Sequence, residues 1–210
     1  MKALYCVYLA SSSPRRRDLL RQIGVNFDVL AFRSGERGQD ADVDETPLPD
    51  ESSEKYVERI ALSKAHAGMR RLLWRKLPRR PVLAADTVID LDGCIIGKPV
   101  DVDEARDILR RIEGRSHRVL TAVALSNGRR TQSRLSVSDV EFRPLTEADI
   151  RRYIATNEPM DKAGAYGIQG RAAAFIARIC GSYSGIMGLP LFETACLLDN
   201  FGYRYESAEP

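Results

Sequence analysis

Residues 11–17 constrain the fold of this chain more than any other stretch. They read Ser-Ser-Ser-Pro-Arg-Arg-Arg and directly follow an apolar run, residues 5–10, that predicts a buried strand. Serine before proline favours the start of a helix, because Ser13 can cap it and Pro14 fits its first turn, where a missing N–H costs nothing. The segment therefore predicts a strand, a hydroxyl-rich loop and a helix whose free N–H groups point at that loop, an arrangement that binds anions.

The arginines of the same segment add a second argument for an anion. Arg15, Arg16 and Arg17 fall in the first turn of the expected helix, where the helix dipole disfavours cations. A negatively charged partner would remove this conflict. An exposed basic turn on a surface helix is the alternative interpretation, and this segment alone does not separate the two.

Size and composition indicate an ordinary soluble protein. The chain has 210 residues, 44% of them hydrophobic and 29% charged, which suffices for one large domain or two small lobes. A net charge of +3 is too small to predict non-specific nucleic-acid binding. No apolar run reaches the length of a membrane span, and the N-terminus lacks the pattern of a signal peptide. The four cysteines, Cys6, Cys94, Cys180 and Cys196, form no CxxC pair; we expect small buried residues of a reducing compartment, hence the cytoplasm.

Apolar periodicity and turn residues predict an α/β protein. Asp92-Gly93 and Asn127-Gly128 are typical of tight hairpin turns, and Thr146 to Asp149 reads as a capping box. Strands and helices alternate, with one central antiparallel pair, which favours a mixed sheet flanked by helices. The long loop over residues 33–53 is of a kind that is usually functional or mobile. The expected helices cover residues 53–77, 103–112 and 189–200, with another after Thr146, and the expected strands cover residues 82–89, 119–125, 135–142 and 175–179.

Asp86 is the leading candidate for chemistry. It interrupts an apolar strand, and a buried carboxylate without a partner is very costly. Such acids often lie at the carboxyl end of a strand, where ligands bind in α/β proteins. Two roles are open. Asp86 can be structural, as a salt bridge or a backbone-bonded acid at a strand end, or functional, as a metal ligand or general base.

Further charged candidates lie on both sides of Asp86. Lys98 follows the Asp92-Gly93 turn, across a short hairpin from Asp86, so the two can share a cleft. The stretch around Lys98 is not a phosphate-binding P-loop, because Gly93 to Gly97 is one residue too short and Pro99 replaces the metal-binding Ser or Thr. Acids of the long loop can supply oxygen ligands for magnesium or manganese, or form a solvated charge run, and Lys64 can face the cleft or solvent. These acids are Asp42, Asp44 and Glu45.

A glycine-rich segment over residues 161–170 completes the set of candidates. Gly164, Gly167 and Gly170 indicate close backbone approach or unusual dihedrals. Gln169 lies between two of these glycines. It can offer both an acceptor and a donor to the edge of a base, or can bond its own backbone. The two histidines, His66 and His117, have no partner at catalytic spacing, so we expect structural or exposed roles.

Together these segments resemble the Maf family of nucleoside triphosphate pyrophosphatases. The resemblance extends from about residue 7 to residue 200, and its pieces occur in the family's order. The glycine-rich segment is similar to that of the branch acting on dTTP and UTP, and Gly185 stands where the family commonly has asparagine. The matching pieces are residues 9–16, 43–46, the helix through Ala61 and Lys64, residues 85–87, 97–99, 161–170 and 188–191.

The resemblance implies a fold, a reaction and a set of roles. It implies one domain, residues 1–210, with two lobes around a central cleft as in the inosine triphosphatase-like enzymes, and a homodimer. It implies hydrolysis of the α–β phosphoanhydride of dTTP and UTP with Mg²⁺ or Mn²⁺, and it extends to modified pyrimidine nucleotides. By the family pattern Asp86 accepts the proton of water and, with Glu45, holds the metal. Residues that set substrate choice would be Arg15, Thr87 and Gln169, and residues lining the phosphates would be Ser11, Arg16, Lys64 and Lys98.

Two other functions fit the same residues. A module could bind a nucleotide or RNA phosphate in this cleft without cutting it. A pyrophosphatase could instead remove inosine or modified purine nucleotides. Pyrophosphate release from each triphosphate distinguishes the three.

Overall fold

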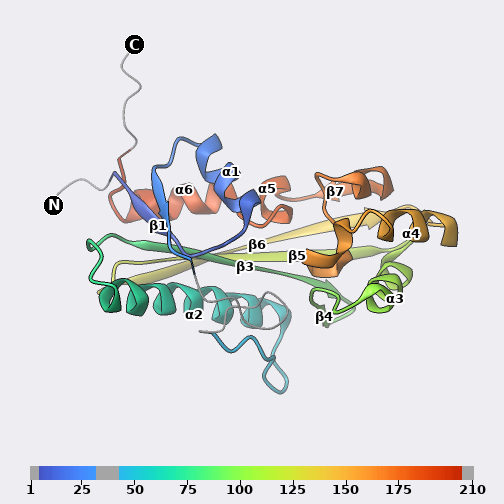
Figure 1. Ribbon diagram of the computed structural model, residues 1–210, viewed down its shortest axis with the longest axis horizontal. Coiled ribbons are helices and arrows are strands. Elements are labelled where there is room, and N and C mark those ends of the chain that lie inside the picture. Colours follow the sequence, from blue (N-terminus) through green and yellow to red (C-terminus); the bar gives the residue numbers. More distant parts are fainter. Residues whose placement is uncertain (1–4, 32–42, 205–210) are drawn as a thin grey trace, which may run out of the picture.

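The fold is built on one mixed seven-stranded sheet. The computed structural model describes residues 5–31 and 43–204, and Figure 1 shows the sheet running along the longest axis of the molecule. The strand order is β2-β1-β3-β5-β6-β7, with β4 paired to β3. The strands are β1 (Val7–Leu9), β2 (Phe27–Val29), β3 (Val82–Leu91), β4 (Cys94–Ile96), β5 (Ser116–Ser126), β6 (Thr131–Phe142) and β7 (Ile176–Cys180).

Helices cover both faces of the sheet. In Figure 1, α2 runs beneath the sheet, α1 and α6 lie above it, and α3 and α4 lie at the end that carries β4 and β7. Short 3-10 turns connect α4 to β7. The helices are α1 (Pro14–Gln22), α2 (Ser53–Trp74), α3 (Val102–Ile112), α4 (Glu147–Ile154), α5 (Tyr183–Ile186) and α6 (Leu191–Asn200), and the 3-10 turns are η2 (Glu158–Asp161), η3 (Ala163–Ala165) and η4 (Arg171–Phe175).

The sheet is mixed, as predicted, but more of it is antiparallel than the sequence indicated. β1 runs parallel to both β2 and β3. From β3 onward every pairing is antiparallel, through β5 and β6 to β7. The sequence predicted one antiparallel pair, and the sheet has more. Strand direction depends on which strands pair, and local sequence patterns do not encode strand pairing.

Three apolar clusters form the core. One lies between α2 and the sheet, and includes Ile60 and Ala61. A second lies on the opposite face under α1 and α6, and includes Leu20 and Leu197. The third fills the end of the molecule that carries α3, α4 and β4. The single domain with two lobes stays a prediction.

One edge of β3 is open in the middle, and this gap positions the site. The parallel pairing with β1 ends at Leu9 opposite Leu83. The antiparallel pairing with β4 begins only at Ile89 opposite Ile96. Within the described residues, β3 therefore has no strand partner on this edge over residues 84–88, and Asp86 lies at the centre of the gap.

Several predicted boundaries needed correction. α2 ends at Trp74 rather than at residue 77, because Lys76 adopts a left-handed φ of 54°. Leu73, in the last turn of α2, is 55% exposed. β5 and β6 extend beyond their predicted ends because they form one long hairpin, and β2 was not predicted. The long loop continues from Val43 to the start of α2, while residues 33–42, with Asp42, lie outside the described part of the chain.

The prediction for the cysteines was wrong. Cys94 and Cys180 are exposed, Cys6 and Cys196 are half-buried, and all four are free thiols. The error is physical in origin: Cys94 lies on the short strand β4, and Cys180 ends β7, so neither reaches the core. Among the described helices, none has the length and apolar character that crossing a membrane requires.

Candidate active site

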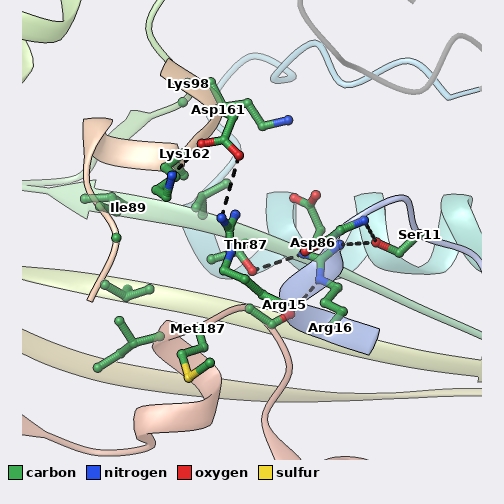
Figure 2. Close-up of a pocket in the computed structure, with 18 of the residues that line it drawn as sticks. Ser11, Arg15, Arg16, Asp86, Thr87, Ile89, Lys98, Asp161, Lys162 and Met187 are labelled. Atoms are coloured by element: carbon green, nitrogen blue, oxygen red, sulfur yellow. Dashed lines mark hydrogen bonds and ion pairs between the residues drawn. The ribbon is translucent and has the colours of Figure 1, made fainter. Parts of the chain in front are cut away.

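A cleft of about 640 Å³ opens at the gap in the edge of β3. Figure 2 shows side chains from α1, β3 and the glycine-rich segment converging on it. The structure brings every predicted site residue to this one cleft. These are Ser11, Arg15, Arg16, Glu45, Lys64, Asp86, Thr87, Lys98 and Gln169.

Asp86 shares a lysine with a second acid. Lys64 Nζ lies 2.7 Å from Asp86 Oδ1 and 2.7 Å from Glu45 Oε1. Burial lowers the pKa of Lys64, but the charges of Asp86 and Glu45 outweigh it, and the net shift is upward. The buried carboxylate of Asp86 thus has the partner that its burial requires. Asp86 lies in mid-strand rather than at a strand end as expected; the strand that ends here is its neighbour β1.

The segment that carries Glu45 is fastened to α2. Tyr56 donates a hydrogen bond to the backbone oxygen of Glu45 at 2.8 Å. Arg59 donates to the carbonyl of Thr46 at 3.0 Å and grips Glu51 at 2.6 and 2.7 Å. Sequence reasoning missed these supporting residues, because the pairs join a loop to a helix and carry no local signal.

Arg16 joins three segments at the floor of the cleft. Its Nε donates to Gly188 O at 2.7 Å, Nη1 to Ser11 Oγ at 3.3 Å and Nη2 to Thr87 Oγ1 at 3.3 Å. Gly188 has a φ of +110°, which favours glycine at this close approach. Burial lowers the pKa of Arg16, and the charge of Asp86 opposes that shift.

The start of α1 differs in one detail from the prediction. Ser13 occupies the N-cap and Pro14 the first turn, as expected, but the Ser13 side chain makes no capping hydrogen bond. Instead Ser11 Oγ accepts the N–H of Ser13 at 3.2 Å and the Arg16 bond described above. The extended φ and ψ of Ser13 direct the loop toward the cleft, so Ser11 organises it.

The outer rim of the cleft is also cationic. Arg15 lies 3.7 Å from Asp161, which also pairs with Lys162 at 2.6 Å. Lys98 makes no ion pair within the described part of the chain. Although Lys98 is exposed as a residue, partial burial of its ammonium lowers its pKa, and the like charges of Lys64 and Arg16 lower it further. A polyanion in the cleft would relieve this repulsion.

The glycine-rich segment holds Gln169 free for a ligand. Gln169 is exposed, and its side chain makes no hydrogen bond to the described residues. Glu158 secures the loop by accepting from Tyr153 Oη at 2.9 Å and from the N–H of Arg171 at 3.1 Å. A Cβ on Gly170 would overlap the Glu158 carboxylate. A side chain at position 170 would therefore displace the Glu158 carboxylate from these contacts.

Comparison with known proteins gives the family. A family profile described as Maf-like protein matches residues 6–201. This chain belongs to the Maf-like family. A curated dTTP/UTP pyrophosphatase of Aromatoleum aromaticum is 70% identical over 197 residues, covering 94% of this chain and 96% of that protein. The dTTP/UTP pyrophosphatase of Dechloromonas aromatica is 54% identical over 198 residues, covering 94% and 98%.

The Maf-like chain also has a weak likeness to a solved structure. The Ham1 protein of Staphylococcus aureus aligns with a TM-score of 0.48 at 15% identity, covering 93% of this chain and 97% of that one. At this level of similarity the alignment adds nothing to the assignment of the fold or the site.

The histidines of the Maf-like chain stay outside the cleft chemistry, as predicted. His66 is exposed and bonded to Thr131 Oγ1 at 3.1 Å. His117 is buried and bonded to Tyr166 Oη at 2.7 Å, and burial lowers the pKa of His117 to about 4. A neutral, enclosed imidazole supports Tyr166 from behind the glycine-rich segment.

The acids of the Maf-like cleft offer two carboxylates to a metal ion. Within the described residues no group of three or more His, Cys, Asp or Glu side chains is placed to hold one. Glu45 and Asp86 nevertheless converge on Lys64. Mg²⁺ is commonly held by one or two carboxylates together with substrate phosphates, so this donor set fits a metal that arrives with a polyphosphate.

Proposed function

We propose that this chain hydrolyses dTTP and UTP between the α and β phosphates, giving the nucleoside monophosphate and pyrophosphate. Relatives named dTTP/UTP pyrophosphatase, up to 70% identical over nearly the whole chain, support the proposal. The observation that carries it is the cleft, where a buried carboxylate, Asp86, lies among cationic side chains from separate elements.

The cations bind the triphosphate. Arg16 has five N–H groups and donates three to described residues, so two can face phosphate oxygens. Arg15 and Lys98 reach the cleft from opposite sides of the gap in β3. Charge-assisted hydrogen bonds to phosphate are among the strongest available, and arginine can form them in pairs. The Ser11 loop and the N-terminus of α1 add neutral donors.

Asp86 is the general base. Lys64 holds Oδ1 at 2.7 Å, and Oδ2 accepts no hydrogen bond from the described residues. Oδ2 is thus free to take the proton of the attacking water. Because phosphoryl transfer depends mainly on positioning and charge stabilisation, the reaction needs no covalent enzyme intermediate.

Glu45 and Asp86 hold a divalent cation, Mg²⁺ or Mn²⁺. When bound, such an ion neutralises phosphate charge and lowers the pKa of bound water. Lys64 keeps the two acids together before the metal arrives, because its ammonium offsets their mutual repulsion.

Substrate choice belongs to the nucleoside end of the cleft. Arg15, Thr87 and Gln169 select thymine and uracil, and the same pocket extends to modified pyrimidine nucleotides. The free amide of Gln169 can donate its N–H to a carbonyl oxygen of these bases.

The test is pyrophosphate release from purified protein incubated with each common and several modified triphosphates, with Mg²⁺ or Mn²⁺. The proposal predicts release from dTTP and UTP, with the nucleoside monophosphate as co-product, and none after removal of the metal with a chelator. Absence of release with tight nucleotide binding would identify a binding module. A preference for inosine or modified purine nucleotides would identify a purine-directed enzyme.

The proposal also covers the oligomeric state and the location of the protein. The family resemblance supports a homodimer and a cytoplasmic location. Light scattering coupled to size-exclusion chromatography tests the dimer, which predicts a mass of twice 23.5 kDa. Cell fractionation tests the location.

A further inference from the structure

Thr121 lies behind the cleft and is wholly buried, with 0% of its surface exposed. It pairs with Thr87 across the β3–β5 ladder. Its Oγ1 donates to the backbone oxygen of Gly185 at 2.8 Å and lies 3.0 Å from Thr87 Oγ1. Nothing in the family resemblance assigned this residue a role.

The direction of the hydrogen bonds around Thr121 follows from counting protons. Each threonine hydroxyl has one proton and two lone pairs. A carbonyl can only accept, so the single proton of Thr121 goes to Gly185 O. In the bond between the two hydroxyls, Thr87 must therefore donate. Arg16 can only donate, so its Nη2 occupies a lone pair of Thr87 Oγ1 at 3.3 Å.

The series of hydrogen bonds thus runs in one direction, with each group donating to the next, from Arg16 through Thr87 and Thr121 to Gly185 O. Thr87 Oγ1 uses its proton in the bond to Thr121 and one lone pair in the bond from Arg16. It retains one lone pair for a ligand. It can accept a hydrogen bond from a substrate but cannot donate one. An ionised phosphate oxygen has no proton to give, so Thr87 does not face the phosphate tail.

The surroundings of Thr87 match a nucleobase. Ile89 lies two residues along β3, so its side chain shares a face with that of Thr87. Ile186 and Met187 line the same cleft beside α5. Figure 2 shows Thr87 between Arg16 and an apolar region that includes Ile89 and Met187. A flat base packs against such a wall more readily than a phosphate does.

We propose that Thr121 is a positioning residue that makes Thr87 an obligate acceptor, so that Thr87 reads the imide N–H that thymine and uracil share. Cytosine carries a bare ring nitrogen at this position, and two acceptors facing each other leave a buried polar group unpaired. This inference rests on the proposed function and identifies the base-reading group within it.

Gly185 lies in a closely packed turn. A Cβ on Gly185 would lie 2.9 Å from Ser136 Oγ and 3.1 Å from Ser182 Cβ. The N–H of Gly185 donates to Ser182 Oγ at 3.0 Å. Close packing therefore holds the carbonyl that receives the Thr121 proton.

The test compares Thr121→Val, which keeps the shape and removes the hydroxyl, with Thr121→Ser, which keeps the hydroxyl. Thr194→Val is the matched control. Thr194 is also fully buried and also donates to a backbone carbonyl, Pro190 O at 2.7 Å, but it lies in α6 and outside the cleft lining. Thermal midpoints show that each variant is folded.

Two readouts are taken for each variant. The first is the ratio of kcat/KM for UTP to that for CTP, from pyrophosphate release. The second is the ratio of dissociation constants for the α,β-methylene analogues of UTP and CTP, which needs no turnover. We expect Thr121→Val to reduce both preferences for uracil about tenfold, as loss of one hydrogen bond of ordinary strength does. Thr121→Ser and Thr194→Val should keep them.

The outcomes separate this inference from the proposed function. Suppose that Thr121→Val releases pyrophosphate from UTP with an unchanged preference for uracil. This result overturns the role of Thr121 and leaves the proposed function standing. An equal loss for UTP and CTP overturns it too, because that is the result of a merely structural role. If the wild type releases no pyrophosphate, the proposed function fails, and the binding ratios alone decide the role of Thr121.

Discussion

Individual lysines in the cleft differ in how far neighbouring acids balance their charge. Lys64 is balanced by Asp86 and Glu45, which raise its pKa despite burial. At Lys98, burial and the charges of Lys64 and Arg16 outweigh the opposing charges of Glu45 and Asp86, so its pKa is lowered. Of these two lysines, Lys98 therefore loses its proton first as the pH rises.

The affinity for substrate should fall on the alkaline side through Lys98. Only the protonated ammonium attracts phosphate, and the lowered pKa of Lys98 places its deprotonation below the usual range for lysine. We expect kcat/KM for dTTP to decline as the pH approaches that pKa. In Lys98→Arg the decline should move to higher pH, because arginine stays charged. Titration of the substrate is common to both proteins, so identical alkaline limbs would contradict this role.

Gln169 should control selectivity rather than folding. Its side chain makes no hydrogen bond to described residues and is exposed, so its removal leaves no buried group unpaired. We expect Gln169→Ala to keep its thermal midpoint within about 1 °C, as surface substitutions do, and to flatten the preference for dTTP and UTP over other triphosphates. A substrate profile identical to the wild type would count against it.

Some site residues could be singled out because they leave a mark in the sequence, whereas Thr87 came only from the family resemblance. Asp86 interrupts an apolar strand, and the arginines of α1 stand at the wrong end of a helix dipole. Thr121 leaves no such mark. Its role depends on β3–β5 register and on a carbonyl 64 positions away in the chain, and local sequence specifies neither.

At the scale of elements, the cleft exists because two short strands share one edge of β3 without meeting. β1 leaves at Leu9 and β4 arrives at Ile89. The start of α1, α2 and the glycine-rich segment contribute side chains to this opening. The loop that bears Glu45 is fastened to α2 through Arg59 and Glu51.

Loosening that fastening should weaken metal-dependent turnover. Arg59 lowers the pKa of Glu51 to about 2, with partial burial opposing the shift. Glu51 is therefore ionised and paired at neutral pH. We expect Glu51→Gln to raise, by about threefold to tenfold, the Mn²⁺ concentration for half-maximal pyrophosphate release, because Glu45 is less well held.

The matched control for this prediction is Glu147→Gln. Glu147 forms a similar paired contact with Arg110, at 2.7 and 3.0 Å, between α4 and α3 and outside the cleft. It should leave the Mn²⁺ requirement unchanged. Equal Mn²⁺ requirements in Glu51→Gln and Glu147→Gln would contradict the proposed role of the Arg59–Glu51 pair in holding Glu45.

Elements were predicted best where their signals are local. The capping box of Thr146 and Asp149 is present as expected, and the Asp92-Gly93 turn has positive φ at both residues. The end of α2 and the short strand β2 were not predicted. Their limits depend on tertiary pairing, such as that of Val7 with Phe27, which propensities do not determine.

For the whole molecule, the cationic cleft implies that a bound polyphosphate stabilises the fold. Arg15, Arg16 and Lys98 are brought together by folding and repel one another in the absence of an anion. A ligand that binds only the folded state at about 100 times its Kd adds about 2.7 kcal/mol of stability.

We therefore expect α,β-methylene-dUTP, which resists cleavage, to raise the thermal midpoint by roughly 5–10 °C at such saturation. Added salt should reduce the shift, because it screens the charges. Differential scanning fluorimetry in low and high salt measures both. No shift at any analogue concentration would mean that the cleft does not bind the triphosphate.

The most direct test of the account is single-turnover hydrolysis of dTTP by Asp86→Asn beside the wild type. Lys64 keeps its bond to Glu45 in this variant, so the fold should persist. We expect binding of dTTP in the absence of metal to stay equal or become tighter, since a negative charge is lost. Formation of dTMP and pyrophosphate should slow at least roughly a hundredfold, the low end for loss of a general base. Near-normal turnover by the folded variant would contradict the account.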